Sequence, residues 1–487
     1  GAPGGAGGGG GGSGDRRGQA EGGDEGPWGA AADERPKDAD SAAAAVGRAA
    51  AAFATAARRG DGDGIPPWCG AGTPAAAVHA GLVNTGNTCF LNAVLQALLA
   101  LPPLRALVEA LRATYAPSVL VQKAGAPMLA ALLDFVADLP LAAGSGDNKV
   151  VGQSRRHRNR GGTGAGGWSN GPVQTMRPRA FDESLRRFRD GHGSTQQDAQ
   201  ELLTFVLDSL HIELAAMQVK ARQREGAGAR SGDGQEGEQQ PASGGSNAGA
   251  DEWEEVGTKG RSLGSTRHVG GDMGNDADAA VAATAITSAI AALMQGEVLS
   301  TVRADSARAS TTVQPFTLLT LDIPDADVAG SYIGGSVATV ESLLAAMCYS
   351  DEVEYTPEGC SHPTLARKTL SLRSLPPVLV LHLNRFAFGA VGASKRARPV
   401  RLAAQLRPPP GTLAGGRAGV RACGTYTLTA VVCHMGASLN NGHYVADVRT
   451  QTGGWLRCDD SLVDDISQRR VLEGDADTAY LLFYTRQ

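Results

Sequence analysis

Three stretches of low complexity limit how much of this chain can fold. Residues 1–78 are rich in glycine and alanine and open with runs of glycine. Residues 144–177 are rich in glycine and asparagine, and residues 222–278 in glycine, serine and acidic residues. Segments of this composition bury too little apolar surface to offset the entropy lost on ordering them. We therefore expect a disordered N-terminal region and one folded domain over 79–487, interrupted by two flexible insertions.

One part of the N-terminal region has a different character. Residues 42–57 are mostly alanine, which has the highest helix propensity of any residue. Ser41 precedes this run, and serine is a typical helix N-cap. The sequence therefore predicts a short helix here, without indicating what it packs against.

Within the folded domain, helical patterns come first and strand patterns follow. Apolar residues recur at helical spacing in five segments, 91–99, 104–113, 127–137, 181–188 and 196–217. Apolar and β-branched runs typical of strands follow at 298–302, 313–323, 365–372, 378–388, 426–433, 444–448, 455–458 and 480–484. This separation of helices and strands indicates an α+β domain.

A cysteine stands at the start of the first of these helices. Cys89 follows a polar loop that contains Gly86, and Asn87 or Thr88 can cap the helix. Backbone N–H groups and the positive end of a helix dipole favour an anion at this place, here a thiolate. Cys89 is therefore a candidate nucleophile, and Asn84 is a candidate donor to an oxyanion. A lone cysteine is more often a buried small hydrophobe, so this interpretation needs a base.

A candidate base lies far downstream. His443 begins a predicted strand after the polar loop at 434–442, and Gly442 leaves room for a substrate backbone. The next predicted strand ends in Asp459 and Asp460, so either carboxylate can reach the imidazole. Taken singly, these residues are typical of solvated turns. Together with the cysteine, they fit a nucleophile, base and acid that are distant in sequence and adjacent in the fold.

The two segments resemble the cysteine and histidine boxes of the ubiquitin-specific proteases, a family of papain-like deubiquitinating thiol hydrolases. Three further blocks resemble the family in the same order along the chain. Residues 196–203 are similar to its glutamine–aspartate–glutamate helix, 375–386 to its palm strand and 478–484 to its closing strand. The palm strand departs from the family at Asn384, where lysine is usual.

Among the subgroups, the chain resembles that of ubiquitin carboxyl-terminal hydrolase ten, through residues 312–316, 441–444 and 454–457. The resemblance implies a fold of the papain-like cysteine protease superfamily, with a helical thumb and sheets that form palm and fingers. Many members hold zinc at the fingertips with two Cys-x-x-Cys pairs, but this chain has residues 303–306 and 356–360 at those places. Because structural zinc needs four ligands, we expect fingers without zinc, and no cofactor.

The resemblance also implies a catalytic role for each residue of the site. Cys89 would attack the carbonyl carbon of the C-terminal glycine of ubiquitin. His443 would take the thiol proton and later give a proton to the leaving lysine amine. Asp459 would orient the imidazole, with Asp460 as the second candidate for this role, and Asn84 would stabilise the oxyanion.

Five residues are expected to bind the substrate. Asp198 and Glu201 lie one helical turn apart and match family positions that pair with arginines of the ubiquitin tail. Gly442 and Tyr444 would line a narrow channel for the paired glycines of that tail, and Gln96 is assigned to the same group. For Asp198 and Glu201 by themselves, a solvated helix face is the alternative.

Two alternative functions stay open beside a deubiquitinase. One is a catalytically silent scaffold that binds ubiquitin, although the cysteine, histidine and acid are all present. The other is a thiol protease for a ubiquitin-like modifier. In each case the expected partners are ubiquitin, or its relatives, and the proteins conjugated to it, and the catalytic domain is expected to be a monomer.

Charge and composition add little about other partners. The net charge of −5 is too small to indicate one. A basic run at 155–160 can touch RNA, but a solvated insertion explains it better, so we expect no nucleic acid. The sequence contains no run of about eighteen apolar residues, so it does not predict a membrane span. The seven scattered cysteines show no disulfide framework, which suits a reducing cytoplasmic or nuclear location.

Overall fold

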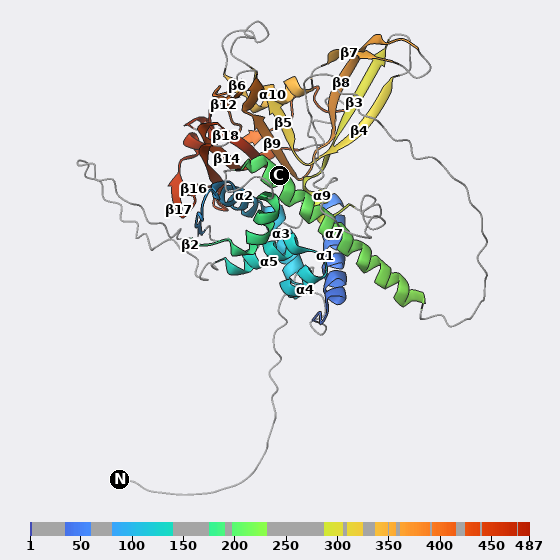
Figure 1. Ribbon diagram of the computed structural model, residues 1–487, viewed down its shortest axis with the longest axis vertical. Helices are drawn as coiled ribbons and strands as arrows, with labels where there is room; N and C mark the ends of the chain where they lie inside the picture. Colours follow the sequence, from blue (N-terminus) through green and yellow to red (C-terminus); the bar gives the residue numbers. More distant parts are fainter. Residues whose placement is uncertain are drawn as a thin grey trace, which may run out of the picture.

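The computed structural model places the helices and strands in two adjoining bodies (Figure 1). It describes residues 1, 35–59, 80–139, 175–189, 197–230, 287–304, 309–324, 337–348, 350–356, 361–389, 392–414, 424–438, 441–474 and 476–487. One body is helical and the other is built from sheets, and most of the helices precede most of the strands. This is the α+β class that the sequence indicates.

Most helices belong to the helical body. They are α1 (Ala39–Arg59), α2 (Cys89–Leu99), α3 (Pro102–Arg112), α4 (Ser118–Lys123), α5 (Pro127–Asp138), the 3-10 turn η2 (Arg179–Phe181), α6 (Asp182–Arg189), α7 (Ala199–Arg230) and α9 (Ala289–Met294). Both α3 and α5 begin with proline, whose fixed φ and missing N–H suit the first turn of a helix.

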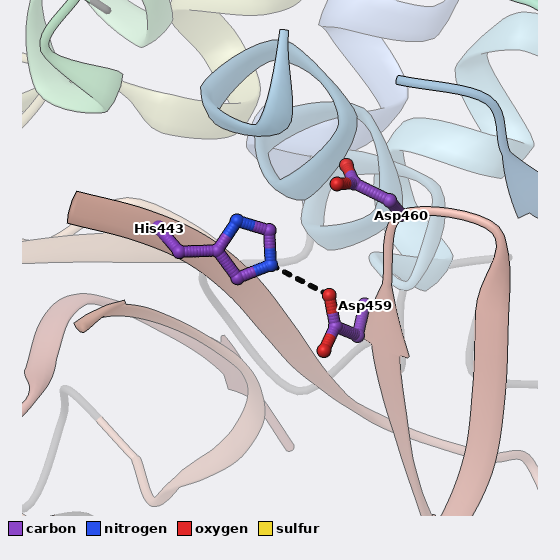
Figure 2. Close-up of side chains that lie close together, drawn as sticks. All are labelled: His443, Asp459 and Asp460. Atoms are coloured by element: carbon purple, nitrogen blue, oxygen red, sulfur yellow. Dashed lines mark hydrogen bonds and ion pairs between the residues drawn. The ribbon is translucent and has the colours of Figure 1, made fainter. Parts of the chain in front are cut away.

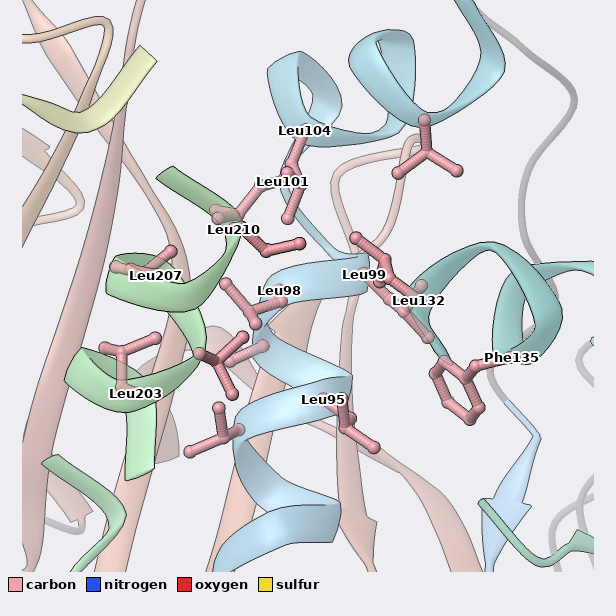
Figure 3. Packing of buried hydrophobic residues seen from close by; sticks show 14 of the residues in the cluster. Leu95, Leu98, Leu99, Leu101, Leu104, Leu132, Phe135, Leu203, Leu207 and Leu210 are labelled. Carbon is pink, nitrogen blue, oxygen red and sulfur yellow. The ribbon is translucent and has the colours of Figure 1, made fainter. Parts of the chain in front are cut away.

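The helix α2 is the centre of this body. All of its residues, Cys89–Leu99, are buried. Figure 3 shows α2 between α7, which carries Leu203 and Leu207, and α5, which carries Leu132 and Phe135. On another side α2 packs against strands of the larger sheet. A helix enclosed in this way is apolar on every face, and its first residue is held in a fixed position.

The larger sheet has eight strands. They are β5 (Leu319–Asp322), β9 (Val378–Asn384), β13 (Gln405–Leu406), β14 (Tyr426–Ser438), β15 (Asn441–Arg449), β16 (Trp455–Asp459), β17 (Leu462–Ile466) and β18 (Ala479–Arg486). Their order is β17-β16-β15-β14-β18-β9-β5, and β13 pairs with β14. Val378 and Val380 of β9 belong to the core under the helices, whereas Leu379 and Leu381 belong to the core behind the sheet. Because both faces are covered, β9 is a continuous apolar run.

A second sheet of four strands projects away from the helices (Figure 1). Its strands are β3 (Gly296–Ala304), β4 (Ser310–Phe316), β7 (Asp351–Tyr355) and β8 (Thr364–Ser374), in the order β4-β3-β8-β7. The single strand predicted over 313–323 is therefore two, because β4 lies in this sheet and β5 in the larger one. Parts of 303–306 and 356–360 lie outside the described residues, so fingers without zinc stay a prediction.

Short elements complete the described fold. They are β1 (Gly81–Leu82), β2 (Thr175–Met176), β6 (Ala338–Thr339), α10 (Val340–Met347), β10 (Phe386–Gly389), β11 (Gly392–Lys395), β12 (Val400–Arg401) and the π-helical turn η3 (Arg470–Gly474). Strands β1 and β2 pair in parallel, which fixes the segment just before the cysteine loop.

The N-terminal region differs from the expectation of disorder at α1. This helix is longer than the predicted 42–57, and its buried residues, such as Val46 and Phe53, belong to the main core. At Gly47 a Cβ atom would lie 2.1 Å from the carbonyl oxygen of Met217 in α7, so the two helices meet at a distance that only glycine permits. The small alanine side chains allow the same close approach along the helix. Disorder over 1–78 is therefore wrong for α1.

The start of α1 also differs from the prediction. The cap is Asp38, whose Oδ1 accepts from the Ser41 N–H at 2.7 Å, while Ser41 Oγ accepts from the Asp38 N–H at 3.2 Å. This reciprocal pair is a capping box, with Ser41 at its third helical position. The predicted serine thus takes part in the cap, but the helix begins earlier.

Both predicted insertions contain ordered residues at their edges. Strand β2 lies within the predicted 144–177, and α7 continues into the predicted 222–278 as far as Arg230. The basic run 155–160 and the rest of both insertions lie outside the described residues. By length and hydropathy, residues 199–225 of α7 would qualify as a membrane span, but 56% of the apolar window is buried inside the fold. Packing against α1, α2, α5 and α9 accounts for its apolar composition.

Candidate active site

Cys89 is the first residue of α2 and is only 3% exposed. Thr88 occupies the N-cap position, but its side chain does not cap the helix. Its hydroxyl instead donates to Asn84 Oδ1 and accepts from the Thr85 N–H, each at 3.1 Å. The capping predicted for Thr88 is therefore wrong. Because the Thr88 hydroxyl does not occupy the first-turn N–H groups of α2, these groups can stabilise a negative charge.

His443 and Asp459 lie on the neighbouring strands β15 and β16, and Figure 2 shows them in contact. His443 Nε2 lies 2.6 Å from Asp459 Oδ1. This hydrogen bond, together with one to Cys89, raises the pKa of His443 to about 10, although burial acts in the opposite direction. The same contact holds the pKa of Asp459 below its ordinary value. The structure thus joins Cys89, His443 and Asp459 in one hydrogen-bonded row.

Asp460 serves a different purpose from its neighbour. Its backbone has φ +49°, which turns the carboxylate away from the Asp459 side and toward α2 (Figure 2). Oδ1 accepts from Asn92 Nδ2 at 2.8 Å, and Oδ2 accepts from Asn84 Nδ2 at 2.9 Å. The Asp460 carbonyl also accepts from the Leu82 N–H at 2.7 Å. Asp460 therefore ties the turn after β16 to both sides of the cysteine loop, and Asp459 is the residue that holds the imidazole.

Asn84 is fixed by both ends of its amide. Its Oδ1 accepts from the N–H groups of Gly86 and Thr88 at 3.0 and 3.1 Å, which determines the orientation of the amide group. One Nδ2 hydrogen is used by Asp460. A primary amide carries two such hydrogens, so the second is the one that can serve an oxyanion.

The two acidic residues near the start of α7 are unequal. Asp198 precedes the helix, its Oδ1 accepts from the Gln200 N–H, and its Oδ2 accepts from the Tyr480 hydroxyl, each at 2.6 Å. Its carboxyl group is enclosed although the residue as a whole is only half-buried, and this burial raises its pKa to about 6. Glu201, in the first turn, is exposed. Of the pair, Glu201 is thus the carboxylate that stands in solvent.

Three predicted substrate-binding residues have contacts within the protein, and their substrate roles stay predictions. A Cβ at Gly442 would lie 2.3 Å from His434 Nε2, so the glycine makes room for a buried histidine of this chain. Tyr444 is 1% exposed and packs against His434, with ring centroids 4.7 Å apart, so it does not line an open channel. Gln96 is 2% exposed and donates to the Ala80 carbonyl at 2.6 Å, which places it in the core.

Three residues of the site were not foreseen from the sequence. Asn92 holds Asp460, and a buried amide on the otherwise apolar α2 was a signal that could have found it. Arg189 of α6 donates to the Asn87 carbonyl at 2.8 Å and lies over the Phe90 ring, so it braces the cysteine loop. Tyr480 anchors Asp198. Nothing local in the sequence marks Arg189 or Tyr480, because their partners are distant along the chain.

A protein-family model described as ubiquitin carboxyl-terminal hydrolase matches residues 80–484. The chain belongs to this family. The family resemblance drawn from the sequence motifs is therefore confirmed. The helix α1 lies outside the matched range.

Curated relatives of this ubiquitin carboxyl-terminal hydrolase family member carry the same family name. Ubiquitin carboxyl-terminal hydrolase 24 of Arabidopsis thaliana is 30% identical over 418 residues, which are 83% of this chain and 64% of the relative. Ubiquitin carboxyl-terminal hydrolase 10 of Rattus norvegicus is 30% identical over 426 residues, which are 83% of this chain and 48% of the relative. The chain therefore spans between about half and two thirds of the length of these two proteins.

Solved structures share the fold of the chain. The SAGA DUB module bound to monoubiquitin contains a chain that is 21% identical, with a TM-score of 0.51 over 85% of this chain and 70% of that one. The same module bound to ubiquitin aldehyde gives 20% identity and a TM-score of 0.52, with the same coverage. At this identity the likeness shows the fold, which agrees with the papain-like thumb, palm and fingers expected from the sequence.

Proposed function

We propose that this chain is a cysteine deubiquitinase, which hydrolyses the peptide or isopeptide bond after the C-terminal glycine of ubiquitin. The observation that carries the proposal is the row of Cys89, His443 and Asp459 at the N-terminus of a buried helix, in a chain of this family. Family relatives named as ubiquitin hydrolases support the substrate class.

The first chemical step follows from the charge state of the pair. With a pKa of about 10, His443 holds its proton at neutral pH as an imidazolium. In the proposed step the nucleophile is the Cys89 sulfur as a thiolate, with its proton on the imidazole. The thiolate attacks the carbonyl carbon of the terminal glycine and a tetrahedral oxyanion forms. In this proposal, that oxygen accepts from the first-turn N–H groups of α2 and from the second Nδ2 hydrogen of Asn84, the first being used by Asp460.

The second step reverses the role of the imidazole. His443 gives its proton to the departing amine, and the carbon–nitrogen bond breaks, which leaves an acyl-enzyme on Cys89. Because Cys89 helps to raise the pKa of His443, acylation removes that contribution. The neutral ring can then take a proton from water, which attacks the thioester and releases the ubiquitin carboxylate. Asp459 keeps the ring oriented throughout.

The acidic residues near the start of α7 support recognition of a basic tail. Glu201 is exposed, and burial raises the pKa of Asp198 to about 6, so an arriving arginine would favour the ionised form of Asp198. The same features suit ubiquitin-like modifiers with a basic tail. Cleavage of ubiquitin and modifier fluorogenic substrates, compared side by side, distinguishes the two, and a clear preference for a modifier would exclude the ubiquitin assignment.

The decisive experiment uses a ubiquitin probe with an electrophile at its C-terminus. We expect a covalent adduct on the wild type and none on Cys89→Ser. Cys348→Ser is the matched control, because burial raises the pKa of the Cys348 thiol to about 11 and it lies outside the site, so this variant should still react. No adduct on a folded wild type that binds ubiquitin would favour the silent scaffold instead.

We further propose that the protein acts as a monomer in a reducing cytoplasmic or nuclear compartment. What supports the compartment is that the seven cysteines of the sequence are scattered and show no disulfide framework. Fractionation of cells with an antibody to the protein tests the location, and light scattering tests the oligomeric state.

A further inference from the structure

A pocket lies at the end of α2 that is remote from Cys89. It is enclosed by α2, α3 and α5, and its space, with the open mouth included, is about 530 Å³. Nine of its eleven lining residues are apolar, among them Leu99 of α2, Val108 of α3 and Phe135 of α5. Figure 3 shows Leu95 and Leu99 of α2 and Leu132 and Phe135 of α5 around this region. Its lining is mostly apolar with a few polar groups, as in small-ligand pockets.

The polar group of the pocket is a guanidinium with unused hydrogen-bonding capacity. Arg105 of α3 lines the pocket, and its Nε is buried without a hydrogen-bond partner among the described residues. Burial lowers the pKa of Arg105, and no carboxylate of the described residues acts in the opposite direction. Arg105 as a whole is half-buried, but a buried N–H without an acceptor is costly, so such atoms are normally paired.

The second polar residue does not provide the missing acceptor. Glu109 also lines the pocket, but it is exposed, and its Oε1 pairs with Arg112 Nη1 at 3.3 Å. The charges at this end of α3 therefore sum to an excess of one cation, with Arg105 on the pocket side. An apolar cavity with one uncompensated cation is complementary to an apolar molecule with one anionic group.

We propose that this pocket binds a single-chain amphiphile, with its apolar tail among α2, α3 and α5 and its carboxylate on Arg105. A carboxylate can accept from the guanidinium in a bidentate manner, which satisfies the buried Nε. The tail displaces only weakly held water from apolar walls. The site is separate from the catalytic row, because it adjoins the last turns of α2 whereas Cys89 begins the helix.

Binding is measured best with two probes that differ only in the head group. Dodecanoate and dodecanol, below their aggregation concentrations, are titrated into the full chain while the leucine and valine methyl signals of the pocket are followed by NMR. We expect dodecanoate to bind about tenfold to a hundredfold more tightly than dodecanol, the usual value of a hydrogen bond to a charged group.

Variants test whether the difference in affinity between dodecanoate and dodecanol depends on Arg105. Arg105→Met keeps the apolar stem and removes the charge, so it should weaken dodecanoate by the same factor and leave dodecanol unchanged. Arg48→Met is the matched control, because Arg48 is an exposed arginine of α1 that does not line the pocket, and it should leave both probes unchanged. Val136→Trp, which fills the pocket, should abolish binding of both.

Three results would overturn the proposal. They are equal binding of the two probes to the wild type, a loss of dodecanoate binding in Arg48→Met equal to that in Arg105→Met, and methyl shifts that do not map to the pocket. Because the wild type is tested first, failure of one variant to fold does not remove the comparison between the head groups. Each variant is checked for its melting temperature, and dodecanoate itself should raise that of the wild type with increasing concentration.

Discussion

Two pairs of acidic residues flank the site, Asp459 with Asp460 and Asp198 with Glu201. The pKa of Asp459 is lowered, whereas the pKa of Asp198 is raised. At the end of β16, Asp459 faces a protonated imidazole and its pKa is below the ordinary value. At the start of α7, Asp198 is enclosed, its hydroxyl and amide donors are neutral, and its pKa is raised to about 6. The comparison teaches that a carboxylate near a site keeps its charge only where a cation compensates for burial. Asp459 and Asp460 are therefore called the complete pair, and Asp198 and Glu201, which we propose bind a cation of the substrate, are called the incomplete pair.

The largest expected effect is at the complete pair. Asp459→Ala removes the acceptor that orients His443 and holds its pKa high, so kcat should fall by about 10²–10⁴. The measurement is turnover of a fluorogenic ubiquitin substrate. Asp464→Ala, an exposed carboxylate on β17, is the control and should leave kcat unchanged. If Asp459→Ala retained full activity, Asp459 would not be the orienting acid.

The next largest effect is at Asn84, which links the acid turn to the cysteine loop. Asn84→Ala should lower kcat by about 10²–10³ and change KM much less, because its second amide hydrogen acts only on the oxyanion. Thr85→Ala is the control, since only the backbone N–H of Thr85 is used in the loop. An unchanged kcat in Asn84→Ala would remove Asn84 from the oxyanion hole.

A smaller effect is expected in the pH dependence of the incomplete pair. The pKa of Asp198 is raised from 3.8 to about 6, so below pH 6 the folded protein holds this group neutral, and ionisation costs stability as the pH rises through 6. A basic tail binds the ionised form, so KM should be about two- to tenfold higher at pH 5 than at pH 7.5. Asp198→Asn should flatten this profile. A KM that is independent of pH in the wild type would mean that Asp198 does not meet the substrate.

No effect is expected from a metal chelator. His443, Asp459 and Asp460 place ligand atoms within 4.8 Å of one another, but the acid and imidazole are already paired. The fingers are also expected to hold no zinc. Activity and melting temperature should therefore be the same with and without chelator, and a drop in melting temperature alone would indicate zinc in the fingers.

The sequence predicted those helices and strands that are determined by the pattern of neighbouring residues. Apolar periodicity located α2, α3 and α5, and the continuous runs located β9 and β18. The cysteine, histidine and aspartate were found because each stands next to a recognisable helix or strand boundary. Apolar periodicity indicates that one face of a helix or strand is buried, but it does not indicate which element packs against that face. For that reason the partner of α1, the division of 313–323 between two sheets and the enclosure of Tyr444 were not foreseen.

Two of the predicted substrate-binding residues have contacts inside the protein that the sequence did not indicate, and their substrate roles stay predictions. Gln96 and Gly442 were assigned to the substrate, yet each satisfies a contact inside the protein, with the Ala80 carbonyl and with His434. Similarly, Asp459 and Asp460 are adjacent in sequence, and only the positive φ of Asp460 separates their roles. A one-dimensional motif does not distinguish a side chain that meets substrate from one that supports it.

The close contact of α1 and α7 at Gly47 has a consequence for biosynthesis. The apolar face of α1 leaves the ribosome well before α7 is made, and at usual rates of synthesis the wait is roughly ten to thirty seconds. During that time Val46 and Phe53 lack the surface that buries them in the finished protein. The nascent chain is therefore expected to expose this helix to chaperones. Folding of the helical body is expected to finish only after α7 has emerged.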